Sequence, residues 1–118
     1  MLQITQLTLE PKQNMTVALP NGDIFTMNVR YKPQQQGWFI ENLTYSDFVL
    51  NSLRITTSPN MLLQWRNFLP FGLGCFSVNN REPMLLEDFT SGDCKLYVLS
   101  QAEVQDYVDF ITYGYQVY

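Results

Sequence analysis

The sequence predicts a mainly β domain, a small antiparallel barrel or sandwich with a short C-terminal helix. Three observations support this fold class. Short segments that alternate between apolar and polar residues recur at intervals of about ten residues, with turn-forming residues between them. Aromatic residues make up 14% of the chain, a surplus that favours strands. One segment near the C-terminus has apolar residues at helical spacing instead.

The chain length of 118 residues suits one domain with one hydrophobic core, so we expect residues 1–118 to fold as a single unit. Charged residues make up only 15% of the chain and hydrophobic residues 46%, which argues against intrinsic disorder. No segment reaches the run of about 20 apolar residues that a membrane-spanning helix needs, and no basic leader precedes an apolar stretch at the N-terminus. We therefore expect a soluble protein without a classical export signal.

The first part of the chain predicts an edge strand and a hairpin. Residues 2–9 alternate in part and are expected to form the edge strand. Residues 15–19 and 24–31 are expected to pair through Asn21 and Gly22, a dipeptide that supplies positive φ angles in tight hairpins. The apolar side chains of the second strand share one parity, which places them toward the core: Phe25, Met27, Val29 and Tyr31.

A second hairpin or meander is expected after a polar loop at residues 34–37. Its strands are residues 38–45 and 48–57, with Ser46 and Asp47 in the turn between them. In the later strand the apolar residues Val49, Leu53 and Ile55 share one parity, and the polar residues take the other: Ser52, Arg54 and Thr56.

The second half of the chain predicts a short connection and two further strands. Residues 61–67 follow a break at Pro59 and form either one helical turn or a loop. Residues 70–74 contain a proline and two glycines and are expected to be a turn-rich connection. Strands are expected at residues 75–78 and 94–99.

Residues 101–111 predict one amphipathic helix. Ser100 and Glu103 have the spacing of a capping box, in which each side chain binds the backbone amide of the other residue. Apolar residues follow at helical spacing: Val104, Tyr107, Val108 and Ile111. Gly114 is expected to end the helix. The tail that follows is too aromatic for an ordinary solvated end, which suggests that it docks on another surface.

The absence of histidine argues against most catalytic and metal sites. Histidine is the commonest general base and the commonest zinc ligand, so the chain lacks the usual partner of a serine or cysteine nucleophile. Cys75 and Cys94 lack C-x-x-C spacing and are expected to be buried free thiols in a reducing compartment. We predict that the protein is not an enzyme and uses no cofactor or metal.

Three acidic residues, Glu87, Asp88 and Asp93, are candidates for a carboxylate site. A general acid–base pair formed by Glu87 and Asp88 is disfavoured, because adjacent residues of a strand face opposite sides. A calcium site is disfavoured because the D-x-D-x-D-G pattern is absent. A solvated loop is the favoured interpretation of this segment.

The charge balance disfavours nucleic-acid binding. The chain has 7 basic and 11 acidic residues, a formal net charge of −4, so it has no general attraction to phosphate. Acidic residues line the polar side of the expected helix: Glu103, Asp106 and Asp109. They form an ordinary solvated face or, as the alternative, a patch that repels DNA.

The aromatic residues favour burial in a core or an interface. Trp38 and Trp65 could stack on bases or sugars, but few basic residues surround them in the sequence, so packing is the better interpretation. Many aromatics, few charges and an aromatic tail indicate a surface that is covered in an assembly; the alternative is a monomer with an aromatic core. The residues predicted at a subunit interface are Tyr113, Tyr115, Val117, Tyr118 and Trp65.

Several short segments occur in order over most of residues 14–99: Val29-Arg30-Tyr31, Gly37-Trp38-Phe39-Ile40, Ser52-Leu53-Arg54-Ile55, Asn60-Met61-Leu62-Leu63, Gly72-Leu73-Gly74-Cys75-Phe76, Leu86-Glu87-Asp88-Phe89 and Lys95-Leu96-Tyr97-Val98. Their order and spacing resemble the baseplate plug domain of tailed phages, a family known from a cyanophage. The chain differs from that family in two turns, at residues 46–47 and 58–59, which lack the usual glycines. It also carries an extra segment, residues 101–118.

The resemblance implies a non-enzymatic component of the virion near the distal end of the phage tail, which closes the tail tube or joins the hub to it. It implies other tail or baseplate proteins as partners and several copies around the tail axis, assembled in the host cytoplasm. No specific nucleic acid and no membrane span are expected. The alternative function is a monomeric β module that binds a sugar or peptide through exposed tryptophan or tyrosine.

Overall fold

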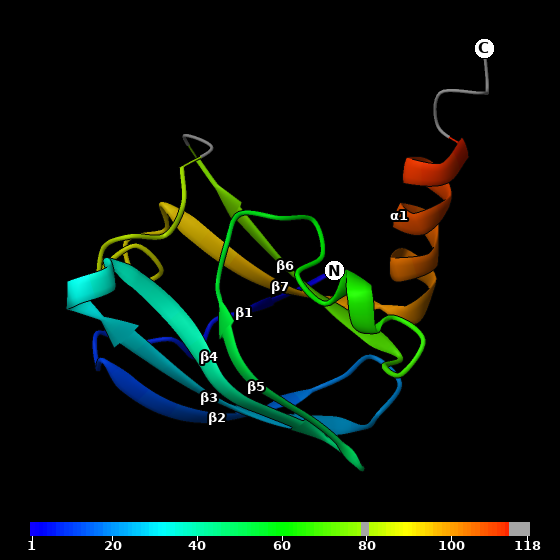
Figure 1. Ribbon diagram of the computed structural model, residues 1–118, viewed down its shortest axis with the longest axis horizontal. Coiled ribbons are helices and arrows are strands. Elements are labelled where there is room, and N and C mark those ends of the chain that lie inside the picture. The colour runs from blue at the N-terminus through cyan, green and yellow to red at the C-terminus, as the bar shows by residue number, and fades with distance from the viewer. Residues whose placement is uncertain (79–80, 114–118) are drawn as a thin grey trace.

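The computed structural model describes residues 1–78 and 81–113. It confirms the mainly β class, because two antiparallel sheets pack against each other and one short helix follows the last strand (Figure 1). The two sheets remain separate. Of the two expected architectures, the described strands therefore form the sandwich and do not close into a barrel.

The four-stranded sheet is a meander of consecutive hairpins. Its strands are β2 (Lys12–Ala18), β3 (Ile24–Lys32), β4 (Gly37–Tyr45) and β5 (Phe48–Arg54), and they lie in this order across the sheet. Both hairpins occur where the turn residues predict them. In β3 the predicted parity is confirmed, because alternate apolar side chains are each 1% exposed: Phe25, Met27 and Val29.

The first hairpin turns through Pro20, Asn21 and Gly22. The Gly22 amide donates a hydrogen bond to the Leu19 carbonyl at 3.0 Å, and the Asn21 side chain accepts one from the Asp23 amide at 2.9 Å. Gly22 has a φ of 93°, whereas Asn21 has no positive φ. The turn therefore needs one left-handed residue, which is typical of a three-residue hairpin loop built on a type I turn.

A bulge in β4, where it pairs with β3, reverses the direction of the side chains halfway along β4 and β5. Ile40 and Leu43 are both fully buried although they differ in parity, and the register between β3 and β4 shifts at this point. On β5, Ser52 has a left-handed φ of 63°. Leu50 is buried, and Val49 is 53% exposed although it shares the parity of the buried Ile55, because the alternation is interrupted.

The three-stranded sheet contains β1 (Leu2–Ile4), β6 (Phe71–Ser77) and β7 (Cys94–Ser100), in the order β1-β7-β6. β1 is an edge strand, as predicted, but it ends at Ile4 rather than at residue 9. β6 begins at Phe71, before the expected start at Cys75. Residues 71–74 therefore belong to a strand and not to a turn-rich connection.

The two glycines of β6 allow the preceding segment to approach the strand closely. The Asn60 Oδ1 atom accepts hydrogen bonds from the amides of Leu62 at 3.0 Å and Leu73 at 3.2 Å. A Cβ atom at Gly72 would lie 2.6 Å from that oxygen, and one at Gly74 would lie 2.8 Å from a backbone carbonyl of the same segment. Both glycines thus serve a close backbone approach, which explains why they mislead a sequence-based prediction.

Aromatic side chains join the two sheets in the core. Phe25 of β3 stacks on Phe71 of β6 with ring centroids 4.6 Å apart and an interplanar angle of 13°. Tyr45 packs edge-on against Phe71 at 5.5 Å. Trp38 is fully buried, and its ring packs edge-on against Phe89 at 5.9 Å. Much of the aromatic surplus of the chain is therefore used inside the sandwich.

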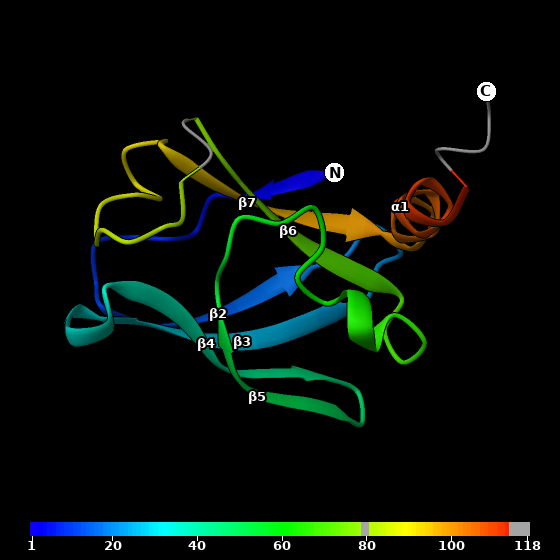
Figure 2. The same cartoon turned by 45° about the horizontal axis from the view of Figure 1, so that its top comes forward.

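The helix α1 (Gln101–Tyr113) follows β7 directly. The Glu103 amide donates to the Ser100 Oγ at 3.2 Å and the Ser100 amide to the Glu103 Oε1 at 3.0 Å, which confirms the capping box. Of the predicted apolar stripe, Val104 is buried, whereas Ile111 is 44% exposed. Figures 1 and 2 show why: α1 stands at one end of the sandwich and extends away from it.

Two 3₁₀ turns complete the described structure: η1 (Pro33–Gln35) between β3 and β4, and η2 (Leu63–Trp65) before β6. The turn η2 confirms the helical interpretation of residues 61–67 over the loop. Within residues 1–78 and 81–113, no helix has the length and hydropathy required to cross a membrane.

Candidate functional site

The residues predicted at an interface are only partly described by the structure. Tyr115, Val117 and Tyr118 lie outside the described residues, and Tyr113 is the last residue of α1. Trp65 is partly buried against the core. It lines a shallow depression of about 390 Å³ together with Leu53, Met61, Leu63, Gln64 and Arg66.

The two tryptophans differ in what they could bind. Trp38 is 0% exposed, and its Nε1 donates a hydrogen bond to the Leu85 carbonyl at 3.2 Å. A sugar or base could stack on Trp38 only if the core opened. Of the two candidates for ligand stacking, Trp65 alone reaches the surface.

Both cysteines are buried and free, as predicted. Burial raises the pKa of Cys75 to about 12 and the pKa of Cys94 to about 11. Because the thiolate is the reactive form, both groups stay protonated and unreactive at neutral pH.

A thiol reagent tests this burial. We expect DTNB to leave both cysteines of the native protein unmodified at pH 8 and to modify two thiols per chain after denaturation in guanidinium, because only unfolding exposes Cys75 and Cys94. The release of thionitrobenzoate measures the reaction. Rapid modification of the native chain at either thiol would contradict the buried, protonated state.

Asp88 forms a buried ion pair with Arg81. Its side chain is 0% exposed, and Arg81 donates to it through Nη2 at 2.6 Å and Nη1 at 3.0 Å. The amides of Met84 and Leu85 also donate to Asp88, each at 2.8 Å. Burial raises the pKa of Asp88, but these hydrogen bonds outweigh it and hold the pKa below its ordinary value. The favoured interpretation as a solvated loop was wrong for Asp88, because residues 81–88 fold around the carboxylate.

The same loop is fastened to the four-stranded sheet. The Tyr31 hydroxyl donates to the Met84 carbonyl at 2.7 Å, and Trp38 donates to the next carbonyl, as described above. Asp93 lies 3.6 Å from Arg81 on the solvent side. Two of the three candidate carboxylates, Asp88 and Asp93, thus converge on the Arg81 guanidinium. Within the described residues, no three side chains of His, Cys, Asp or Glu gather as a metal ion would require.

The solvent-facing side of the four-stranded sheet, here called the outer sheet face, carries polar residues in rows that cross all four strands. One row contains only asparagines: Asn14, Asn28, Asn42 and Asn51. The next row is mostly threonine: Thr16, Thr26, Thr44 and Val49. The side-chain Nδ2 of Asn42 donates a hydrogen bond to the side-chain Oδ1 of Asn51 at 3.0 Å, so two members of the asparagine row are joined directly.

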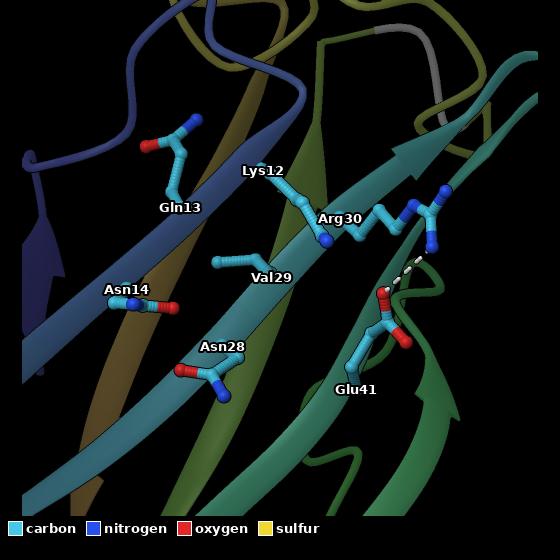
Figure 3. A pocket seen from close by; sticks show the side chains of 7 residues that line it. All are labelled: Lys12, Gln13, Asn14, Asn28, Val29, Arg30 and Glu41. Carbon is cyan, nitrogen blue, oxygen red and sulfur yellow. Dashed lines mark ion pairs between the residues drawn. The ribbon is translucent and has the colours of Figure 1, made fainter.

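One end of the outer sheet face is positively charged. Four basic residues gather there and are called the cationic rim: Lys12, Arg30, Lys32 and Arg54. Figure 3 shows Lys12 and Arg30 on neighbouring strands, with Arg30 extending to Glu41 at 3.5 Å. Lys32 and Arg54 both lie over the ring of Phe39, at 4.6 and 5.3 Å from its centroid. A depression of about 420 Å³ opens beside them and is lined by Lys12, Gln13, Asn14, Asn28, Val29, Arg30 and Glu41.

The sequence predicted the solvent-facing side of β3 but not the rows or the cationic rim. Each row depends on the pairing register between strands, and the turn residues of the hairpins are the signal from which that register could have been predicted.

Large apolar side chains project from several parts of the surface. The most exposed lie in loops and on α1: Val78 at 72%, Phe68 at 69% and Phe110 at 61%. Single exposed apolar residues are common in soluble proteins, but these belong to a larger set that includes Ile24 and Ile111. These residues follow η2 and β6 or lie on β3 and α1, so burying them would require contacts on several parts of the surface.

Comparison with models of known protein families gave no match, and comparison with curated proteins gave none either.

Proposed function

We propose that this chain is a non-enzymatic structural subunit of a bacteriophage tail, positioned at the distal baseplate or hub, where it helps to close the tail tube or to join it to the hub. The observation that carries the proposal is the exposure of Phe68, Val78 and Phe110 on a small domain whose core is already complete. Burial of these side chains against neighbouring subunits would stabilise an assembly. The kind of assembly is proposed from the order of segments, which resembles that of the baseplate plug family.

The groups that could perform chemistry are engaged in the fold, which supports a structural role. Both thiols are buried and protonated, and the buried carboxylate is paired with a guanidinium and two amides. Trp38, one of the two residues on which a ligand-binding module would depend, is inside the core. The four-stranded sheet ends in two edge strands, β2 and β5, and edge strands suit repeated contacts between copies placed around an axis.

The composition of purified particles tests the proposal. Phage particles from the host that carries this gene are expected to contain the chain in several copies, detected by quantitative mass spectrometry, and an antibody to it should label the distal end of the tail in electron micrographs. Absence of the chain from intact particles would overturn the proposal. So would a monomer that binds a glycan or peptide and loses that binding in Trp65→Ala while keeping its melting temperature.

A further inference from the structure

Positive charge is concentrated at one end of the outer sheet face. The cationic rim holds four of the seven basic residues of the chain, and Glu41 forms an ion pair with one of them, Arg30. The rest of the chain contains ten acidic and three basic residues. A positive surface on an acidic protein suits a partner surface of opposite charge.

Most of the rim is not neutralised within the described part of the chain. Arg30 pairs with Glu41, but no carboxylate of residues 1–78 or 81–111 lies within 4.0 Å of Lys12, Lys32 or Arg54. Arg54 donates to the Gln36 carbonyl at 3.0 Å, which fixes its guanidinium beside Phe39. The rim therefore presents positive charge around a partly exposed aromatic ring.

The exposed side of α1 has the complementary chemistry. Asp106, Asp109 and Phe110 are exposed and lie at positions i, i+3 and i+4, which places them on one side of the helix. The helix contains no basic residue to neutralise the carboxylates. It thus offers two negative charges beside an aromatic ring, where the rim offers positive charges beside Phe39.

The two surfaces do not meet within one molecule. In Figures 1 and 2, the end of β3, which carries Arg30 and Lys32, and the adjoining turn η1 lie at the opposite end of the sandwich from α1. We infer that α1 of one copy docks on the cationic rim of a second copy, so that copies associate head to tail. A heterologous contact of this kind repeats from copy to copy and produces a ring or a filament.

This inference rests on the proposed structural role only in its expectation of several copies, and it has a separate test. Lys12→Glu/Arg30→Glu reverses two of the four rim charges, and Asp106→Lys/Asp109→Lys reverses the two exposed carboxylates of the helix; all four residues are exposed, so folding should be preserved. Sedimentation velocity measures association at low and at physiological salt. We expect the unmodified chain to associate at low salt and to dissociate as salt screens the charges. Each reversed variant alone is expected to associate at least about tenfold more weakly than the unmodified chain.

Mixing the two reversed variants gives the decisive result. The acidic helix of the rim variant fits the unmodified rim of the helix variant, so the mixture is expected to form heterodimers where each variant alone does not associate. Matched controls change the same number of charges elsewhere, Asp47→Lys/Glu87→Lys for the helix variant and Arg66→Glu/Lys95→Glu for the rim variant, and should associate as the unmodified chain does.

Three outcomes would overturn the head-to-tail contact: a chain that stays monomeric at low salt, association that neither reversal weakens, or a mixture that fails to assemble. A further outcome, in which the rim variant fails to bind a different acidic tail protein that the unmodified chain binds, would assign the rim to that protein instead. None of these results bears on whether the chain is present in phage particles, so the two proposals can fail separately.

Discussion

Asp88→Asn is expected to lower the free energy of unfolding by about 3 kcal/mol, because it leaves a buried site without its negative charge. The carboxylate accepts four hydrogen bonds, two from Arg81 and one each from the amides of Met84 and Leu85. An asparagine of nearly the same size must turn its own amide protons toward one of these donors. Urea denaturation followed by tryptophan fluorescence measures the loss.

Asp93→Asn is the matched control for this substitution. Asp93 also faces Arg81, at 3.6 Å, but its side chain is 53% exposed. Solvent-exposed pairs contribute little, so the control should change stability by less than about 1 kcal/mol. Equal effects of the two substitutions would show that burial of Asp88 does not determine the strength of its ion pair.

The same ion pair predicts a loss of stability in acid. Hydrogen bonds from Arg81 and the two amides lower the pKa of Asp88 in the native protein below its ordinary value, despite the opposing effect of burial. Its contribution is therefore fully present above the unfolded-state pKa of about 3.9 and is lost as the pH falls through the lower native value. Urea midpoints of the unmodified chain should fall more steeply between pH 5 and pH 2.5 than those of Asp88→Asn.

Phe71→Ala is expected to destabilise the protein by about 4 kcal/mol, because it removes a large buried ring from the contact between the two sheets. Phe71 is 1% exposed and touches Phe25 and Tyr45 of the opposite sheet. Thermal unfolding by circular dichroism measures the effect. Phe68→Ala is the control, since that ring is 69% exposed and its removal should change stability by less than about 0.5 kcal/mol.

A milder pair of substitutions keeps this prediction testable if Phe71→Ala does not fold. Phe25→Leu and Phe71→Leu, alone and combined, form a double-mutant cycle across the stacked rings. We expect a coupling of about 1 kcal/mol, because stacked aromatics interact beyond the area they bury. Additive effects would mean that the stack contributes only as apolar volume.

The parts of the fold that depend on local signals could be predicted from the sequence. Turn residues placed both hairpins, and the Ser100–Glu103 spacing placed the start of the helix. The bulge could not be predicted, since neither Glu41 nor Ser52 is a residue type that marks one. The sequence does not distinguish a glycine that allows a close backbone approach, such as Gly72 or Gly74, from a glycine that allows a turn. The start of β6 was missed for this reason.

The candidate surfaces were harder to predict than the strands. Burial of Asp88 depends on residues 81–88 folding back around its carboxylate, so that Arg81 and the Met84 amide both donate to it, and no motif in the sequence marks this loop. The outer sheet face depends on register across four strands. Of the predicted interface, Trp65 is at the surface and three tail residues lie outside the described structure, so that prediction stands untested.

The bulge also constrains how the length of this chain can change during evolution. Glu41 has no partner on β3, because Asn28 pairs with Asn42 and Val29 with Ile40, and Ser52 lies opposite it on β5. Deleting Glu41 alone would make the pairing of β3 and β4 continuous but leave Ser52 without a partner on β4, which would move the bulge to the next pair of strands. A length change at this place therefore keeps β4 and β5 in register only when both strands change together.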